Sequence, residues 1–244
     1  MKTVLITGAN RGLGLGMVKY LTKQNKAEII LATCRKPSEE LEKLAQESNK
    51  LQILSLDVTN WESFGEVSSQ VANIVGTGGL NVLINNAGVS TKFTKLGLVK
   101  TEHLLFNFNA NTIAPIMLTQ SLLPLIKQAS QANNSEPMGT GRAAIINMSS
   151  TLGSIAQNDQ GGFYPYRCSK AALNAATKSM SIDLQREQIL VASMHPGWVR
   201  TDMGGAKAPL DVDTSVAGIF NTIQKLGKGD SGKFLQYDGS ELPW

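Results

Sequence analysis

The sequence predicts an α/β protein in which a doubly wound parallel sheet of about seven strands carries helices on both faces. Short apolar runs rich in β-branched residues recur along the chain and alternate with longer segments of helical periodicity. These runs are almost wholly apolar, which is typical of parallel strands buried on both faces. Because the chain has 244 residues, 42% of them hydrophobic, it can bury a large core, and we expect one domain over residues 1–244.

The first residues predict a strand, a tight loop and a helix, in that order. Residues 3–7 are β-branched or apolar, Gly8, Gly12 and Gly14 follow, and residues 15–21 are apolar at helical spacing. Glycines let a backbone approach a phosphate closely, and the positive end of the next helix attracts its charge. Glycine loops also form plain turns, but the position directly after a buried strand favours a dinucleotide site.

The end of the second strand indicates which dinucleotide would bind. Residues 28–33 form an apolar run, and an NAD site would place an acidic residue just beyond it to hold the ribose hydroxyls. Arg35 stands there instead, and together with Arg11 it offers guanidinium groups for a 2′-phosphate. We therefore expect NADP(H) rather than NAD(H). The alternative is that Arg35 is only a solvated strand end.

The rest of the chain continues the alternation of strands and helices. In order we expect a helix at 38–48, a strand at 51–56, a helix from about 59 to 75, a strand at 81–84, a helix at 101–126, a strand at 143–148, a helix that carries Tyr166 and continues to about 186, a strand at 190–194, a helix at 212–226 and a short strand at 234–237. Ser38 is a start signal for the first of these helices, and Thr59 with Glu62 has capping-box spacing. Asn111 lies inside the helix 101–126, so it is either solvated or kept for a polar contact.

Polar residues and glycines follow the carboxyl ends of these strands. Asp57, the segment 85–88, Ser149 with Ser150, and Pro196 with Gly197 all occupy such positions. Ligands of parallel sheets bind beyond the carboxyl ends of the strands, so one crevice can collect these residues. Asp57 would either contact an adenine ring or only order its turn, and the side chains of 85–88 would either approach a ligand or bond local backbone.

Tyr166 and Lys170 are four residues apart and therefore share one face of a helix. A fixed cation beside a phenol favours the phenolate and lowers the pKa of the tyrosine, which suits proton exchange with an alkoxide. Taken alone, the pair is more typical of an ordinary amphipathic surface.

Composition excludes several other classes of protein. No apolar run approaches the roughly 20 residues of a membrane span, and the first residues are too short for the apolar region of a signal peptide, so we expect a cytoplasmic protein without a membrane partner. Cys34 and Cys168 have no zinc-like spacing, which argues against a metal site or a disulfide framework. The net charge of +4 is scattered without a basic block, which argues against a nucleic-acid partner.

Several motifs, in order and at matching intervals, resemble those of the short-chain dehydrogenase/reductase family over essentially the whole chain. They are Thr7-Gly8-x-x-x-Gly12-x-Gly14, Asn85-Asn86-Ala87-Gly88, Ser150, Tyr166-x-x-x-Lys170 and Pro196-Gly197. More narrowly, the stretches 10–16, 145–150 and 195–205 resemble the Sniffer-type carbonyl reductases of animals. The resemblance implies a single-domain Rossmann fold that binds NADP(H).

The resemblance also implies a role for each matching residue. Tyr166 would donate the proton, Lys170 would lower the pKa of Tyr166 and hold the nicotinamide ribose, Ser150 would hydrogen-bond the substrate carbonyl, and Asn111 would complete a catalytic tetrad through a water-mediated path. Asn85 would lie at the adenosine ribose. The residues implied to contact the cofactor are Gly8, Asn10, Arg11, Gly12, Leu13, Gly14, Arg35, Asp57, Val58, Asn85, Ala87, Gly88, Tyr166, Lys170, Pro196, Gly197, Val199 and Thr201.

The implied function is NADPH-dependent reduction of aldehydes, ketones and quinones to alcohols. A non-catalytic NADP(H)-sensing regulator and an alcohol or steroid dehydrogenase of the same family are the alternatives, and the presence of all four catalytic positions favours an enzyme. We expect a small-molecule carbonyl substrate and a homodimer. The interval from Ser150 to Tyr166 is longer than is usual in the family, and Ser149 is an alternative to Ser150. Candidates to line the substrate pocket are Leu152, Phe163, Tyr164, Trp198 and Met203.

Overall fold

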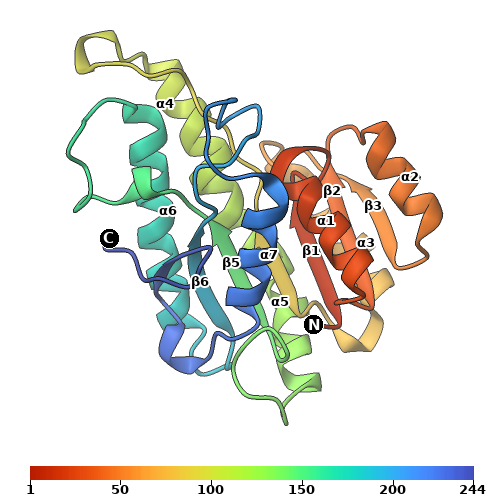
Figure 1. Ribbon diagram of the computed structural model, residues 1–244. Helices are drawn as coiled ribbons and strands as arrows, with labels where there is room; N and C mark the ends of the chain where they lie inside the picture. Colours follow the sequence, from red (N-terminus) through yellow and green to blue (C-terminus); the bar gives the residue numbers. More distant parts are fainter.

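A single seven-stranded sheet organises the computed structural model, which describes residues 1–244 (Figure 1). The strand order is β3-β2-β1-β4-β5-β6-β7, and every neighbouring pair is parallel. The strands are β1 Thr3–Thr7, β2 Ile29–Cys34, β3 Leu51–Ser55, β4 Val82–Asn85, β5 Ala144–Met148, β6 Leu190–His195 and β7 Phe234–Gln236. The predicted doubly wound parallel sheet is therefore confirmed.

Helices cover both faces of this sheet, as Figure 1 shows. The helices are α1 Gly12–Gln24, α2 Glu39–Glu47, α3 Phe64–Val75, α4 Thr101–Phe108, α5 Ala114–Ala132, α6 Tyr164–Asp183 and α7 Val212–Ile223. Helices α1, α2 and α7 pack on one face of the sheet, while α3 and α5 pack on the other, where α6 continues the layer beside β6. No helix is long and apolar enough to cross a membrane.

Alternation of side chains along each strand builds the two cores. In β1, Val4 and Ile6 join the core under α1 and α7, whereas Leu5 joins the core under α3 and α5. In β4, Leu83 likewise faces the α3 and α5 layer. Successive residues of a strand point to opposite faces, so an apolar strand covered on both sides supplies both cores at once.

The expected capping box at Thr59 and the expected helix start beside it were both wrong. Asp57 accepts hydrogen bonds from both the backbone N–H (2.9 Å) and the hydroxyl (2.7 Å) of Thr59, so Thr59 orders a turn and forms no capping box. A short helical turn, Trp61–Ser63, then precedes α3. The predicted start at Ser38 is confirmed, because its hydroxyl accepts the N–H of Leu41.

The predicted helix 101–126 is two helices joined by a π-helical turn, Asn109–Ile113. This turn carries Asn111, and the second helix, α5, continues to Ala132. A π-turn adds one residue to a helical turn, and it is often found where a helix carries a functional side chain.

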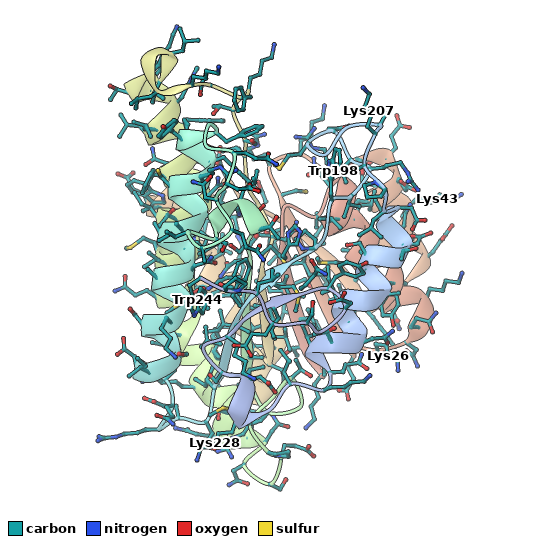
Figure 2. All side chains as sticks on the ribbon, turned by 60° about the vertical axis from the view of Figure 1, so that its left-hand side comes forward. Lys26, Lys43, Trp198, Lys207, Lys228 and Trp244 are labelled. Carbon is teal, nitrogen blue, oxygen red and sulfur yellow. The ribbon has the colours of Figure 1, made fainter.

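The carboxyl ends of the strands lie at one end of the molecule. Trp198 and Lys207, in the loop after β6, lie at this end in Figure 2, whereas Lys228 lies at the opposite end. Strand order reverses between β1 and β4, and open parallel sheets bind ligands at such a switch point.

A buried polar network crosses the molecule below that end. Asn85 on β4 donates to Oδ1 of Asn147 on β5 (2.8 Å) and to the hydroxyl of Thr119 on α5 (3.2 Å). Asn147 donates in its turn to the hydroxyl of Thr177 on α6 (2.9 Å), which also accepts the hydroxyl of Ser193 on β6 (3.0 Å). The network therefore joins three strands to two helices through hydrogen bonds that water cannot replace.

Replacing Asn147 with alanine should lower the free energy of unfolding by about 2–3 kcal/mol, because buried partners on β4 and α6 lose their hydrogen bonds. Urea denaturation of wild type and Asn147→Ala measures the change. Asn60→Ala is the matched control, since Asn60 is exposed and its side chain caps nothing. Equal stability of the two variants would contradict the structural role of this network.

Candidate functional site

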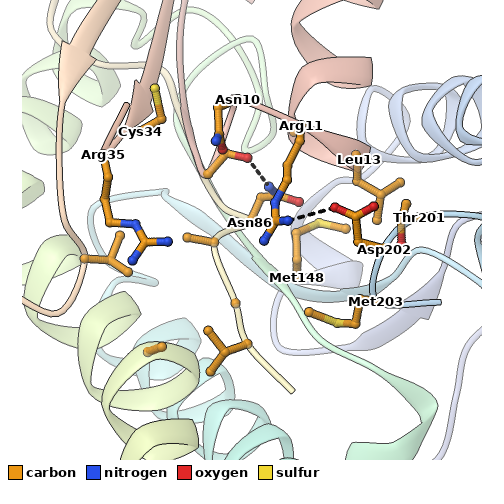
Figure 3. Close-up of a pocket in the computed structure, with 18 of the residues that line it drawn as sticks. Asn10, Arg11, Leu13, Cys34, Arg35, Asn86, Met148, Thr201, Asp202 and Met203 are labelled. Carbon is orange, nitrogen blue, oxygen red and sulfur yellow. Dashed lines mark hydrogen bonds and ion pairs between the residues drawn. The ribbon is translucent and has the colours of Figure 1, made fainter. Parts of the chain in front are cut away.

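A cavity of about 560 Å³ opens at the carboxyl ends of β1 to β6. Its walls come from the glycine loop after β1, the ends of β2 to β5, the helices α4 and α6, and the loop after β6 (Figure 3). The predicted cofactor residues that line it are Gly8, Asn10, Arg11, Gly12, Leu13, Gly14, Arg35, Asp57, Val58, Ala87, Gly88, Tyr166, Lys170, Pro196 and Thr201. The structure therefore brings together residues that the sequence separates by almost 200 positions.

The floor of the cavity is backbone, and glycine is required there. Gly8 has a φ of +67°, and a Cβ atom on it would lie 2.9 Å from Cα of Ala87. A Cβ atom on Gly14 would lie 2.2 Å from the carbonyl oxygen of Gly8. The start of α1 is thus packed against the end of β1 and lines the cavity, an arrangement that fits a pyrophosphate.

Arg35 lies at one end of this cavity, and Arg11 lies nearer the loop after β6. Arg35 extends from the end of β2, and Arg11 extends from the glycine loop (Figure 3). Arg11 forms an ion pair with Asp202, at 2.7 Å between Nη1 and Oδ2, which connects the glycine loop to the loop after β6. Both side chains of this pair are largely exposed, so solvent screens it and it contributes little stability. Arg35 has no ion-pair partner and is therefore free to meet an anionic ligand.

The other end of the cavity is formed by Tyr166 and Lys170, which are both buried. Ser150 lies two residues beyond β5, and its hydroxyl is close enough to the phenol of Tyr166 to favour a lower pKa of that phenol. Ser149, and not Ser150, lines the cavity. The hydroxyl of Ser149 points elsewhere and donates to Oδ1 of Asn174 at 2.7 Å. Of the two adjacent serines, Ser150 is therefore the one whose hydroxyl is placed beside Tyr166.

Burial moves the pKa values of both Tyr166 and Lys170 toward their neutral forms. It raises the pKa of Tyr166 to about 12, although the hydrogen bond with Ser150 opposes this rise. It lowers the pKa of Lys170 to about 8. The expected lowering of the Tyr166 pKa was therefore wrong, because loss of solvent raises it. Lys170 Nζ lies 5.8 Å from the centre of the Tyr166 ring and donates to the carbonyl of Met148 at 2.8 Å.

Asn111 is fixed by the loop that follows β4. Its amide nitrogen donates to the Val89 carbonyl (2.8 Å) and to the Ser169 hydroxyl (3.0 Å), and its oxygen accepts the Val89 N–H (2.8 Å). A Cβ atom on Gly88 would lie 3.1 Å from Oδ1 of Asn111 and 3.6 Å from Nζ of Lys170. The π-turn thus directs Asn111 toward the same point as the buried ammonium.

Three predicted cofactor residues do not line the cavity. The side chain of Asn85 points into the network with Asn147, and the next residue, Asn86, lines the cavity instead. Gly197 has a φ of +83° and packs against Leu210. Val199 is buried beside the same residue through a strand-like bridge. These three residues shape the strand end and the loop around the cavity, and their contact with a cofactor stays a prediction.

Lining residues that sequence reasoning did not single out are Cys34, Leu56, Thr59, Val89, Phe106, Ala110, Met148 and Asp202. Asn86 and Ser149, which the sequence placed just after strands without assigning them to the cofactor, also line the cavity. Phe106 and Ala110 lie on α4 and the π-turn, and no local signal marks them. Of the five residues expected to line a substrate pocket, only Met203 lines this cavity.

Comparison with known proteins decides the family. A family model described as short chain dehydrogenase matches residues 2–210. The chain belongs to this family. Membership confirms the resemblance that the motifs predicted.

Similar short-chain dehydrogenases include two solved structures. The carbonyl reductase Sniffer of D. melanogaster is 49% identical over the full length of both chains, with a TM-score of 0.98. The NADPH-bound carbonyl reductase from chicken fatty liver is 39% identical, with 100% of this chain and 99% of that chain covered and a TM-score of 0.94. The C-signal protein of Myxococcus xanthus is 41% identical over 173 residues, which are 71% of this chain and 98% of that protein. The predicted likeness to Sniffer-type carbonyl reductases is confirmed.

The lowered pKa of Lys170 predicts how stability depends on pH. Below pH 8 the folded protein carries the buried ammonium of Lys170, which lowers the free energy of unfolding. This penalty disappears as folded Lys170 loses its proton near pH 8, whereas Lys170 of the unfolded chain keeps its proton to higher pH. Relative to Lys170→Met, the wild-type free energy of unfolding should therefore rise by roughly 2–3 kcal/mol between pH 7 and pH 10.

Urea denaturation across this pH range measures the difference, and Tyr166, present in both proteins, cancels. Lys178→Met is the control, because Lys178 is exposed on the same helix. Stability curves for wild type and Lys170→Met that run parallel from pH 7 to pH 10 would contradict the burial of the ammonium.

Proposed function

We propose that this protein is an NADPH-dependent reductase of carbonyl compounds, such as aldehydes, ketones and quinones, with Tyr166 as the proton donor. One observation carries the proposal: a single cavity joins the guanidinium of Arg35 and the glycine loop to Tyr166 and Lys170. The family of the chain and the names of the carbonyl reductases to which it is similar support the same reaction class.

The cavity supports NADP(H) as the cofactor. The amides after Gly12 would hold the pyrophosphate, and Arg35 with Arg11 would hold the 2′-phosphate. Asp57 and Val58 would lie at the adenine, and Pro196 and Thr201 would lie at the nicotinamide end. Solved structures similar to this chain are described with NADPH bound in one case and NADP in another.

Bound NADPH supplies the hydride that reduces the carbonyl carbon. Negative charge would then develop on the carbonyl oxygen, and the hydroxyls of Ser150 and Tyr166 would donate hydrogen bonds to this oxygen. Such preorganised donors stabilise the transition state more than the ground state, because the charge appears only as the reaction proceeds.

Tyr166 completes the reaction by giving its proton to the alkoxide. With a pKa of about 12 it is protonated at neutral pH, so it enters the reaction as an acid. Lys170, with a pKa of about 8, is charged at pH 7 and can stabilise the phenolate as it forms. Lys170 Nζ, held by the Met148 carbonyl, can also hold a ribose hydroxyl, and Asn111 beside it would return the proton through water.

Replacing Tyr166 with phenylalanine should reduce turnover at least 100-fold, since a positioned general acid contributes about 10²–10⁴-fold. The affinity for NADPH should change by less than about threefold, because the cofactor loses few contacts. Absorbance loss of NADPH with a quinone measures turnover, and calorimetry measures cofactor affinity. Tyr20→Phe, on α1 and stacked on Phe220, is the control.

Normal turnover by Tyr166→Phe would remove the tyrosine from the mechanism. If wild type binds NADPH tightly and reduces no carbonyl compound, the alternative of a non-catalytic NADP(H) sensor replaces the reductase. Preferred oxidation of an alcohol or steroid by wild type would support a dehydrogenase instead.

Replacing Arg35 with aspartate should lower the preference for NADPH over NADH by about 10- to 100-fold, because a charge-assisted hydrogen bond is lost and a carboxylate repels the 2′-phosphate. The ratio of kcat/KM for the two cofactors measures this preference. Lys36→Asp makes the same reversal of charge on the adjacent exposed residue, which does not line the cavity. An unchanged ratio in Arg35→Asp would exclude Arg35 from cofactor recognition.

A further inference from the structure

The segment between Ser150 and Tyr166 contains little regular secondary structure. Ser150 lies at the end of β5 and Tyr166 lies in the first turn of α6. Between them only a short helical turn, Thr151–Gly153, is regular, and residues 155–160 are all exposed. Something else must therefore fix how far the serine hydroxyl lies from the phenol.

Arg167, the residue after Tyr166, is a buried cation without an acidic partner. Its relative exposure is 8%, and no ion pair of the structure includes it. Its Nε donates to the carbonyl of Gly161 at 3.3 Å, and its Nη1 donates to the carbonyl of Leu152 at 3.5 Å. A buried guanidinium is costly unless its donors are used, and here backbone carbonyls from both ends of the segment use them.

The contact with Leu152 leads directly to Ser150. The backbone N–H of Leu152 donates to the hydroxyl oxygen of Ser150 at 3.2 Å, and this hydroxyl lies near enough to the Tyr166 phenol to influence its pKa. The same turn rests on α6, because a Cβ atom on Gly153 would lie 2.8 Å from Cβ of Lys170. Arg167 is therefore linked through Leu152 to Ser150, which lies near Tyr166, and Tyr166 precedes Arg167 on α6.

The contact with Gly161 fixes the entrance to α6. Gly161, Gly162 and Phe163 all have positive φ angles, of 63°, 65° and 49°. A phenylalanine in this conformation is strained and persists only when its surroundings hold it. Phe163 packs edge-on against Phe93 at 5.0 Å, and its carbonyl accepts the backbone N–H of Arg167 at 2.9 Å. Arg167 therefore stabilises the strained residues before α6 twice: its backbone N–H binds the carbonyl of Phe163, and its side chain binds the carbonyl of Gly161.

We propose that Arg167 is a positioning residue that sets the hydroxyl of Ser150 against the phenol of Tyr166 by holding the carbonyls of Leu152 and Gly161. This inference rests on the proposed reductase function. Arg167 does not line the cavity, and its effect on the reaction passes through Ser150.

A double-mutant cycle tests the coupling between Arg167 and Ser150. The variants are Ser150→Ala, Arg167→Met and the double variant, assayed with NADPH and the quinone or aldehyde that wild type reduces fastest. Arg167→Met should lower kcat by roughly 10- to 100-fold, since a small misplacement of a reacting group costs this much. KM for NADPH should stay within about twofold. The Ser150→Ala substitution should cost much less in the Arg167→Met background, because the serine is then already misplaced.

Two further variants keep the test decisive. Arg167→Lys retains a buried cation that can reach one carbonyl, so it should recover part of the lost kcat, and it serves if Arg167→Met fails to fold. Arg186→Met is the matched control, because Arg186 is exposed beyond the end of α6. It should leave kcat unchanged.

Unchanged kcat in Arg167→Met, or independent losses that simply multiply in the double variant, would overturn the positioning role while leaving the reductase intact. A wild-type protein that reduces no carbonyl compound would overturn the proposed function and, with it, this inference.

Discussion

The close approach of β1 and β4 is the constraint on which the site depends. The hydroxyl of Thr7 accepts the backbone amides of both Asn86 and Ala87, each at 2.9 Å, and joins the two strand ends where the strand order reverses. Gly8 has no side chain, so the two backbones can meet there. The result is a cavity floor of fixed peptide groups at the switch point of the sheet, from which the flanking loops and helices are aligned.

The two ends of the cavity use opposite physical environments. Arg35 is exposed and has no ion-pair partner, so its charge can attract an anionic group from solution, and salt screens that attraction. Tyr166 and Lys170 are buried, and loss of solvent moves both pKa values far from their usual ranges. An exposed cationic end suits recognition of an anionic ligand. An end that excludes solvent suits proton transfer, because the phenol of Tyr166 keeps its proton until a stronger base forms beside it.

Local rules predicted the sheet, the glycine loop and the placement of Arg35, because each depends on a strand end and the residues just after it. Asn85 does not line the cavity for a reason of strand parity: it shares the face of Leu83, which packs under α5, so its side chain enters the core and Asn86 meets the cavity. The π-turn at Asn111 and the raised pKa of Tyr166 depend on tertiary packing, which no short window of sequence contains.

Transfer of deuterium from NADPH labelled at C4 of the nicotinamide tests the central claim most directly. Wild-type protein would be incubated with each of the two labelled stereoisomers and an aldehyde or ketone, and the alcohol product would be analysed by mass spectrometry. Because one cavity fixes the cofactor and the carbonyl against Tyr166, we predict that the label of only one stereoisomer appears on the carbinol carbon. Tight NADPH binding without deuterium in any product would contradict the account.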